Sequence, residues 1–316
     1  MNIRELAINS RINDVIYQVR NASFREGDGA KGYYLMRLGD RTGQIDAIWL
    51  NASDVDLKVG DFVKVEAKVQ KYQGRLQLKI NTCHKIDPET IDHQNYNLSA
   101  VNKKELLDKL HHYVESIEIK PLYDVIKHII FEELYDDFCN APAATFNHHS
   151  YIGGLLEHSI SVTEICNACI PLYKGVNKDI LIAGALIHDI GKVYEFEFGE
   201  SISYTTKGNL FGHIFMGANK FQQECDRLTG FPEFISNHLI HIILSHHGLM
   251  ERGSPVEPRT LEAILVHKAD TADADANAFK LSEIESAGGN WLISRTLNRI
   301  IYLETESDFE MRKSNE

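Results

Sequence analysis

Residues 180–192 read ILIAGALIHDIGK, an apolar run that ends in a histidine, an aspartate and a lysine. The run has the length and composition of a helix that is buried on most of its surface. His188 and Asp189 therefore stand at the end of a buried helix. Burying a charged carboxylate is costly unless a cation compensates it, so this stretch predicts a metal or a charged partner beside Asp189.

Further His and Asp groups flank this pair along the chain: His158, His213, the pair His246–His247, and Asp270. Successive groups are 24 to 33 residues apart, so each falls on a different predicted helix. A helical bundle can direct all of these side chains to one interior point. Imidazoles and carboxylates bind Zn, Fe and Mn. Seven such ligands are too many for one metal but suit two metals that share a carboxylate, an arrangement that cleaves phosphodiesters.

The chain from about residue 97 has the periodicity of helices. Pro121 fits the first turn of one of them. Further helices are expected at about 153–172, 179–191, 209–229, 233–247, 258–278 and 290–305. Residues 194–206 interrupt this pattern and predict a short β-hairpin. Residues 91–316 are therefore expected to form one all-α domain with a small hairpin insertion, and its core spans about 145–280.

The first 90 residues have the alternation of β-strands. Residues 62–70 read FVKVEAKVQ, and the pattern resumes after a turn at residues 72–75. A second hairpin is expected where residues 33–38 and 45–50 flank a Gly-rich turn, and residues 13–20 add a fifth strand. Five short strands without a long helix predict a small closed barrel. The fold class is thus multi-domain α+β, with an all-β barrel over 1–90 followed by the helical domain.

Charge is divided unevenly between these two parts. The whole chain has a net charge of -12, yet residues 1–90 contain 14 Lys and Arg against 12 Asp and Glu. Residues 91–316 contain 19 against 33, together with 14 of the 15 histidines. This balance argues against a general polyanion binder held by bulk charge. It is compatible with a nearly neutral binding domain joined to an acidic metal-binding domain.

Several other classes are excluded by composition. No apolar run approaches the ~18 residues of a membrane-spanning helix, and the N-terminus lacks the pattern of a signal peptide. Five cysteines do not make a disulfide framework, so a cytoplasmic location is expected. Cys166 and Cys169 form a CxxC within a predicted helix, and packing explains them better than zinc binding.

The helical part resembles the HD superfamily of metal-dependent phosphohydrolases. The resemblance rests on HDIGK at 188–192 and on four other segments in the same order: NHHSYIGGLLEHS, GNLFGHI, LSHHG and LEAILVHKADTADA. The N-terminal part, with LGDRTGQIDAIWL at 38–50, resembles a nucleic-acid-binding OB-fold. The two together resemble the YhaM-type 3′→5′ exoribonucleases from about residue 12 to 305. This implies a manganese-dependent enzyme that releases nucleoside 5′-monophosphates from single-stranded RNA, with some activity on single-stranded DNA, through hydroxide that two metals activate.

The resemblance also implies roles for individual residues. The ligands carried over by position are His158, His188, Asp189 and Asp270 for the first metal, and His213 and His246 for the second. Asp189 bridges the two metals, and His247 either completes the second site or contacts phosphate. Lys192 stabilises phosphate oxygens or is simply a cation at a helix end. Asp273 orients a ligand imidazole. His148 or His149 protonates the leaving 3′-oxygen or contacts the terminal nucleotide.

An OB barrel binds single strands through a basic groove and stacked aromatic rings. The candidates for these contacts are Tyr33, Tyr34, Arg37, Lys71, Tyr72 and Arg75. Trp49 shares a face with Ile45 and Ala47 and is expected in the core.

Other interpretations remain open at this point. HD domains also hydrolyse cyclic nucleotides, cyclic dinucleotides and nucleoside triphosphates, although an OB-fold would be idle on such small substrates. A non-catalytic nucleic-acid-binding protein is a third reading, against which the intact ligand set argues. Mixed His and Asp ligation suits Mn, Fe, Co, Zn or Mg. The oligomeric state is also open, with a homo-oligomer among the alternatives, and no membrane partner is expected.

Overall fold

The computed structural model describes residues 2–26, 32–40, 42–52, 55–91, 102–144, 151–198, 202–286 and 290–304. By its backbone packing the chain divides into two compact units. One unit comprises residues 99–277, and the other joins residues 1–98 to residues 278–316. This division differs from the predicted boundary at residue 90, because the last part of the chain packs with the barrel.

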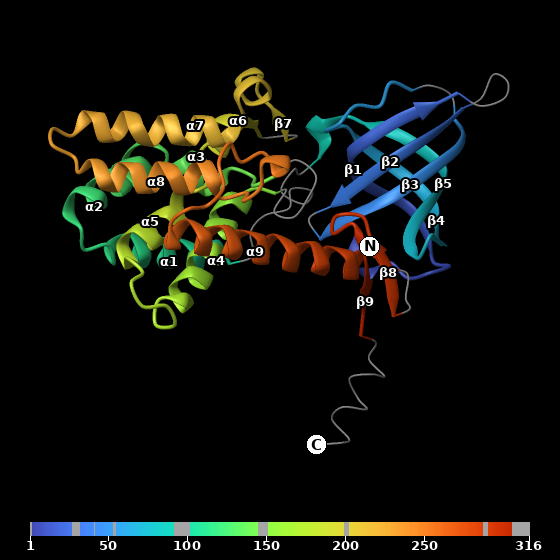
Figure 1. Cartoon of the computed structure of the whole chain (residues 1–316). Coiled ribbons are helices and arrows are strands. Elements are labelled where there is room, and N and C mark those ends of the chain that lie inside the picture. The colour runs from blue at the N-terminus through green and yellow to red at the C-terminus, as the bar shows by residue number, and fades with distance from the viewer. Residues whose placement is uncertain are drawn as a thin grey trace, which may run out of the picture. The chain divides into compact units, whose positions relative to one another are not determined.

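The N-terminal strands close into a five-stranded barrel, as the sequence predicts (Figure 1). The strands are β1 (Arg11–Arg25), β2 (Gly32–Asp40), β3 (Gly43–Ala52), β4 (Phe62–Tyr72) and β5 (Arg75–Ile86). Their order is β1-β2-β3-β5-β4, in which only the β3–β5 pair is parallel. Closure leaves no long unpaired sheet edge.

The alternation that predicted these strands is also the pattern of their burial. Val63, Val65, Ala67 and Val69 of β4 all lie in the barrel core. The β4–β5 turn places Gln73 and Gly74 at positive φ, 49° and 82°. Two successive positive φ values give the turn that matches the twist of a hairpin. Trp49 packs half-buried against the same core, as expected.

The second unit is a helical bundle built around one buried helix. Its helices are α1 (Lys103–Glu115), α2 (Lys120–Lys127), the π-helix η4 (His128–Glu133), α3 (Tyr135–Asn140), α4 (Gly154–Cys169), α5 (Lys178–Ile187), α6 (Lys192–Glu195), α7 (Thr206–Arg227), α8 (Glu233–Ser245) and α9 (Leu261–Glu285). Every residue of α5 from Asp179 to Ile187 is buried. The Asn177 side chain caps α5 by accepting from the Ile180 amide, and the apolar remainder packs against α4 and α8.

Two short hairpins accompany the helices. The predicted hairpin within 194–206 is present as β6 (Phe196–Glu197) and β7 (Ser203–Tyr204). The helix predicted at 290–305 is wrong: β8 (Trp291–Ser294) pairs with β9 (Arg299–Tyr302). Along β8, buried and exposed residues alternate, and Leu292 of β8 and Ile301 of β9 are buried. The apolar residues of this segment also fit helical spacing, but their burial follows the two-residue period of a strand.

The β8–β9 hairpin is tied to the barrel by two arginines. The Arg75 guanidinium, 6% exposed, donates to the Ile293 carbonyl at 2.6 Å. Arg295 Nη1 lies 3.0 Å from Asp46 Oδ2. These contacts explain why residues 278–316 belong to the barrel unit rather than to the helical one.

Within the described residues, no helix is both long and apolar enough to span a bilayer. All five cysteines are free thiols, and Cys166 is buried in α4, which agrees with a packing role.

Arg75→Ala is expected to lower the free energy of unfolding of the barrel unit by about 2 kcal/mol, because a charged hydrogen bond to a buried carbonyl is lost. Both tryptophans, Trp49 and Trp291, lie in this unit, so their fluorescence in a urea titration measures its unfolding. Exposed Arg11→Ala is the matched control. An unchanged midpoint would show that Arg75 does not hold the hairpin.

Candidate metal centre

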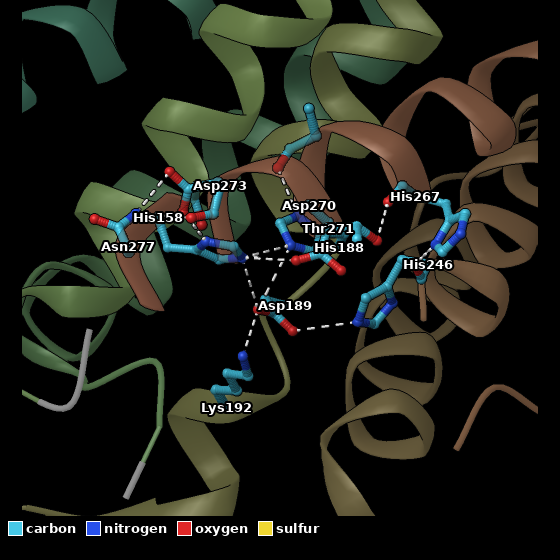
Figure 2. A network of polar contacts seen from close by, with 12 residues as sticks. His158, His188, Asp189, Lys192, His246, His267, Asp270, Thr271, Asp273 and Asn277 are labelled. Carbon is cyan, nitrogen blue, oxygen red and sulfur yellow. Dashed lines mark hydrogen bonds and ion pairs between the residues drawn. The ribbon is translucent and has the colours of Figure 1, made fainter. Parts of the chain in front are cut away.

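The Asp189 carboxylate lies at the centre of a buried cluster of histidines (Figure 2). It follows the end of α5 and is 1% exposed. Its Oδ2 lies 3.4 Å from His158 Nε2 and 3.5 Å from His188 Nε2. Its Oδ1 lies 3.5 Å from His213 Nε2 and 3.4 Å from His246 Nε2. The two oxygens thus face two different pairs of imidazoles.

The first group of ligands comes from α4, the end of α5 and α9. His158, His188 and Asp270 each offer one ligand atom, and these atoms lie within 4.8 Å of one another. His158 Nε2 is 3.2 Å from both Asp270 Oδ1 and His188 Nε2. The second group comes from α7 and the end of α8, where His213, the pair His246–His247 and Asp189 meet the same distance criterion. The structure therefore brings together all seven predicted ligands.

Each of the five imidazoles is held by its Nδ1 atom. Nδ1 has an oxygen partner in every case: Ala185 O for His188 (2.8 Å), Ile243 O for His246 (2.8 Å), Arg252 O for His247 (2.9 Å), Asp273 Oδ2 for His158 (2.7 Å) and Glu195 Oε2 for His213 (3.0 Å). An Nδ1–H that donates to oxygen leaves the lone pair on Nε2. All five Nε2 atoms are thereby presented as metal ligands.

Three buried atoms of this cluster have no hydrogen-bond partner within the described residues: Asp189 Oδ1, His213 Nε2 and His246 Nε2. A buried polar atom without a partner costs about 1–3 kcal/mol, so such atoms mark a missing partner. Because both Nδ1–H groups donate to oxygen, all three atoms can act only as electron-pair donors. A divalent cation satisfies them together, and the donor set of this centre therefore fits metal binding.

Charges around Asp189 keep its carboxyl ionised. Burial alone would raise its pKa, but the Lys192 ammonium and the His188 ring hold the pKa well below its usual value. Burial likewise opposes the ionised form of Asp270, and a hydrogen bond with His158 outweighs it and lowers the pKa. Both carboxylates are therefore anionic ligands across the physiological pH range.

Two histidines of the second group, His246 and His247, are kept neutral. Burial, together with the neighbouring His246 and His213, lowers the pKa of His247 to about 3. Burial also lowers the pKa of His246. Neutral imidazole is the form that binds metal. His158 differs: burial disfavours its charged form, but three carboxylates raise its pKa well above the usual value.

Of the other side chains predicted to take part in catalysis, Lys192 and Asp273 lie in the described part of the chain, and His148 and His149 do not. Lys192 Nζ donates to Asp189 Oδ2 at 2.6 Å, so its charge is directed at the carboxylate in this structure. Asp273 contacts His158 Nδ1, the position predicted for an orienting partner. His148 and His149 lie outside the described residues.

The predicted nucleic-acid contacts of the barrel separate by burial. Tyr34 is 2% exposed, and its hydroxyl accepts from the Val55 amide, so its ring is unavailable for stacking and that prediction is corrected. Arg75 is committed to the β8–β9 hairpin. Tyr33 is half-buried, and Arg37 lies 3.9 Å from Asp46. Tyr72 and Lys71 are exposed at the end of β4 and remain candidates.

Three features of the centre were missed from sequence. Glu195 accepts from both the backbone amide and Nδ1 of His213. Gly212 has a non-helical φ of 71° and bends α7 directly before His213. The bend changes the direction in which the His213 imidazole points. His267 Nδ1 lies 2.7 Å from the His246 carbonyl. The glycine in GNLFGHI was the only local signal, because isolated glycines inside a helical pattern often mark functional bends.

A third cluster, His128, Glu133 and Glu224, also has metal-ligand geometry. Lys220 Nζ pairs with both of its carboxylates, and Arg227 pairs with Glu224 at 2.9 Å. Burial opposes the ionised form of Glu224, but Lys220 lowers its pKa overall. The cluster already contains its own cations and is a structural ion-pair network.

Glu195→Gln is expected to weaken divalent-metal binding at this centre by about tenfold, because the partner that orients His213 loses its charge. Isothermal titration with Mn²⁺ measures the affinity. Exposed Glu197→Gln, on the adjacent strand, is the control. An unchanged affinity would exclude an orienting role for Glu195.

Comparison with known proteins agrees with this geometry. Residues 155–275 match the HD domain model, and residues 15–86 match a model described as an OB-fold nucleic acid binding domain. The chain is 33% identical over 252 residues to the 3′–5′ exoribonuclease YhaM of Listeria welshimeri, covering 78% of this chain and 80% of that protein.

One solved structure is similar, that of a putative aspartyl-tRNA synthetase from Leishmania major. The match covers 71% of this chain and 55% of the synthetase chain, at 11% sequence identity. Its TM-score of 0.23 is too low to carry an argument. The two domain models, by contrast, match both units of this chain, and the relative from Listeria covers 78% of it. The chain therefore belongs to the YhaM family of 3′–5′ exoribonucleases.

Proposed function

We propose that this protein is a metal-dependent 3′→5′ exoribonuclease that hydrolyses single-stranded RNA to nucleoside 5′-monophosphates. The observation that carries the proposal is the Asp189 carboxylate, whose two oxygens face two separate sets of imidazole Nε2 atoms. Family membership supports the polarity of degradation, and the OB-fold supports a polymeric substrate. Single-stranded DNA is proposed as a second substrate.

Two divalent ions fit the centre, with Mn²⁺ as the first candidate and Fe, Co, Zn and Mg as alternatives. The proposed ligands are His158, His188, Asp189 and Asp270 for one ion, and Asp189, His213, His246 and His247 for the other. When bound, such ions supply Lewis acidity toward phosphate and lower the pKa of water. His247 is assigned as a ligand because the Arg252 carbonyl holds its Nδ1 and because its ligand atom lies within 4.8 Å of those of Asp189, His213 and His246.

The protein's own groups then position and neutralise the substrate. Lys192, 13% exposed at its side chain and adjacent to Asp189, is proposed to pair with a non-bridging phosphate oxygen. Asp273 keeps the His158 ring in place through Nδ1. The role of proton donor to the leaving 3′-oxygen stays with His148 or His149 as a prediction from sequence.

Exposed aromatic rings supply stacking surfaces for bases. Tyr72 of the barrel is 52% exposed. In the helical unit, Phe211 and Phe215 are 54% and 57% exposed, on either side of the ligand His213 in sequence. Stacking on aromatic side chains is tolerant of base identity, so these rings suit a nuclease that processes any sequence.

Asp189→Asn is expected to lower the rate on 5′-labelled single-stranded RNA at least 100-fold and to reduce bound metal, because the shared carboxylate is lost. Wild-type protein with Mn²⁺ should produce a ladder that shortens from the 3′ end. Exposed Asp108→Asn is the control. Internal cuts would indicate an endonuclease, and activity on a cyclic dinucleotide but not on RNA would reject the proposal.

Tyr72→Ala is expected to raise the KM for a 20-nucleotide RNA about threefold to tenfold, in line with the loss of one base-stacking contact. Hydrolysis of bis(p-nitrophenyl) phosphate should be unaffected, because that diester does not reach the barrel. Tyr173→Ala is the matched control, since Tyr173 is 49% exposed in the α4–α5 connection. Equal loss on both substrates would argue against a role for the barrel in strand binding.

A further inference from the structure

The outer face of the β8–β9 hairpin (red in Figure 1) exposes four large apolar side chains. They form two cross-strand pairs, Trp291 with Tyr302 and Ile293 with Ile300. Their exposed fractions are 69%, 43%, 66% and 65%, in that order. Side chains that lie opposite each other, or two residues apart along a strand, share one face of a sheet. These four side chains therefore form one continuous surface, the hairpin face.

The opposite face of the hairpin is firmly packed. Leu292, Ile301 and Leu303 are buried together, with Phe279 and Leu297 packed against them. Two arginine contacts also tie the hairpin to the barrel. The exposure of the hairpin face therefore belongs to a fixed element of the barrel unit.

The two aromatic rings of the hairpin face leave surface open for stacking. The ring centroids of Trp291 and Tyr302 are 5.0 Å apart, with an angle of 67° between the ring planes. Such an edge-to-face pair covers one face of one ring. Because both side chains are also well exposed, each offers ring surface on which a planar base can stack.

The charge around the hairpin face suits an anionic partner. Residues 291–302 contain two arginines and no Asp or Glu, although the whole chain has a net charge of -12. Arg295 Nη1 lies 3.0 Å from an Asp46 carboxylate oxygen, and Arg37 Nε lies 3.9 Å from the other oxygen of that carboxylate. Two guanidinium groups thus share one carboxylate, so these three side chains have one positive charge in excess. Phosphates are attracted to such a group.

The hairpin face belongs to the unit that has a nucleic-acid-binding fold. Residues 15–86 match the OB-fold model, and the hairpin lies in the same compact unit. A Cβ on Gly74 would lie 3.3 Å from Leu292 Cδ1, so the hairpin rests on the β4–β5 turn. Tyr72, 52% exposed, lies beside that turn. The hairpin therefore adds aromatic rings to a barrel that already presents one.

The size of the hairpin face favours a strand over a second copy of the chain. Four side chains expose on the order of a few hundred Å², which is the usual size of the largest apolar patch on a monomer. A stable dimer buries about 800 Å² on each partner. A single strand needs only ring surfaces and a nearby positive charge.

We propose that the hairpin face binds single-stranded RNA, with bases stacked on Trp291 and Tyr302; the proposal rests on the exoribonuclease function above. Ile293 and Ile300 extend the apolar surface on which the bases lie. Arg295 attracts the phosphates of the same strand. Stacking on aromatic rings depends little on base identity, so this surface retains RNA of any sequence.

Equilibrium binding tests the hairpin face apart from catalysis. The probe is a fluorescein-labelled 20-nucleotide oligoadenylate, and its Kd is measured by anisotropy with the full-length Asp189→Asn protein, which slows cleavage. Trp291→Ala and Tyr302→Ala are each expected to raise the Kd about tenfold, as for the loss of one stacked base. Tyr173→Ala is the control, because Tyr173 is 49% exposed in the α4–α5 connection. Unchanged Kd values in both hairpin variants would overturn the proposal.

Conservative variants separate stacking from apolar packing. Trp291→Phe is expected to keep most of the affinity, whereas Trp291→Leu, which is apolar but lacks a ring, should behave as Trp291→Ala. Circular dichroism in urea checks that each variant unfolds at the wild-type midpoint. Full affinity in Trp291→Leu would contradict base stacking. An equal loss of affinity for a 20-base-pair RNA duplex would contradict it too, because the bases of a duplex are not free to stack on the protein.

Two further outcomes are decisive. If light scattering showed a wild-type oligomer that Trp291→Ala converts to a monomer with an unchanged Kd for RNA, the hairpin face would be a protein interface and the proposal would be wrong. If Trp291→Ala weakened RNA binding but wild-type protein with Mn²⁺ did not shorten RNA from its 3′ end, the RNA-binding surface would stand and the exoribonuclease function would fail.

Discussion

The structure of the helical unit depends on a single buried carboxylate. Asp189 is placed by the most apolar helix of the chain, where an uncompensated charge would be strongly destabilising. Its two oxygens are surrounded by imidazole Nε2 atoms that come from four separate helical segments. The same constraint that makes this position costly for folding therefore makes it suitable for two cations. Asp189 therefore matters both for the stability of the helical unit and for its metal chemistry.

Orientation of the ligands is achieved mainly by backbone carbonyls at helix ends. His188, His246 and His247 donate from Nδ1 to carbonyls three to five residues away in sequence, and His158 and His213 use carboxylates from distant elements. Helix ends leave carbonyls without intrahelical partners, so a histidine placed there finds its orienting acceptor locally. This explains why the ligand pairs follow α5 and α8 directly. It also explains how three of the five imidazoles are oriented without a partner from a distant segment.

In the barrel unit, two residues that were expected to contact nucleic acid have structural roles instead. Arg75, a plausible nucleic-acid contact from its charge and its place in a hairpin, instead anchors β8–β9 to the barrel. Tyr34, equally plausible, is part of the core. Surface and core positions alternate along a strand, so a shift of one residue decides whether an aromatic ring stacks on a base or on its neighbours. The remaining exposed aromatic groups, in the barrel and beside His213, then become the more suitable contacts for a single strand.

Sequence alone was sufficient for the barrel, the helical bundle and the buried α5, because each rests on local periodicity. Its motifs also named the seven candidate ligands that the structure brings together. It predicted a helix where the β8–β9 hairpin forms. The apolar residues there fit both helical and strand spacing, and only packing against the rest of the structure decides between the two. It also missed the bend at Gly212, and it missed Glu195 and His267, whose contacts join positions 18 and 21 residues apart in the chain. Local chemistry determined which groups could bind metal and nucleic acid. Only tertiary packing decided which distant carboxylates orient His158 and His213, and which charged side chains are left to meet a substrate.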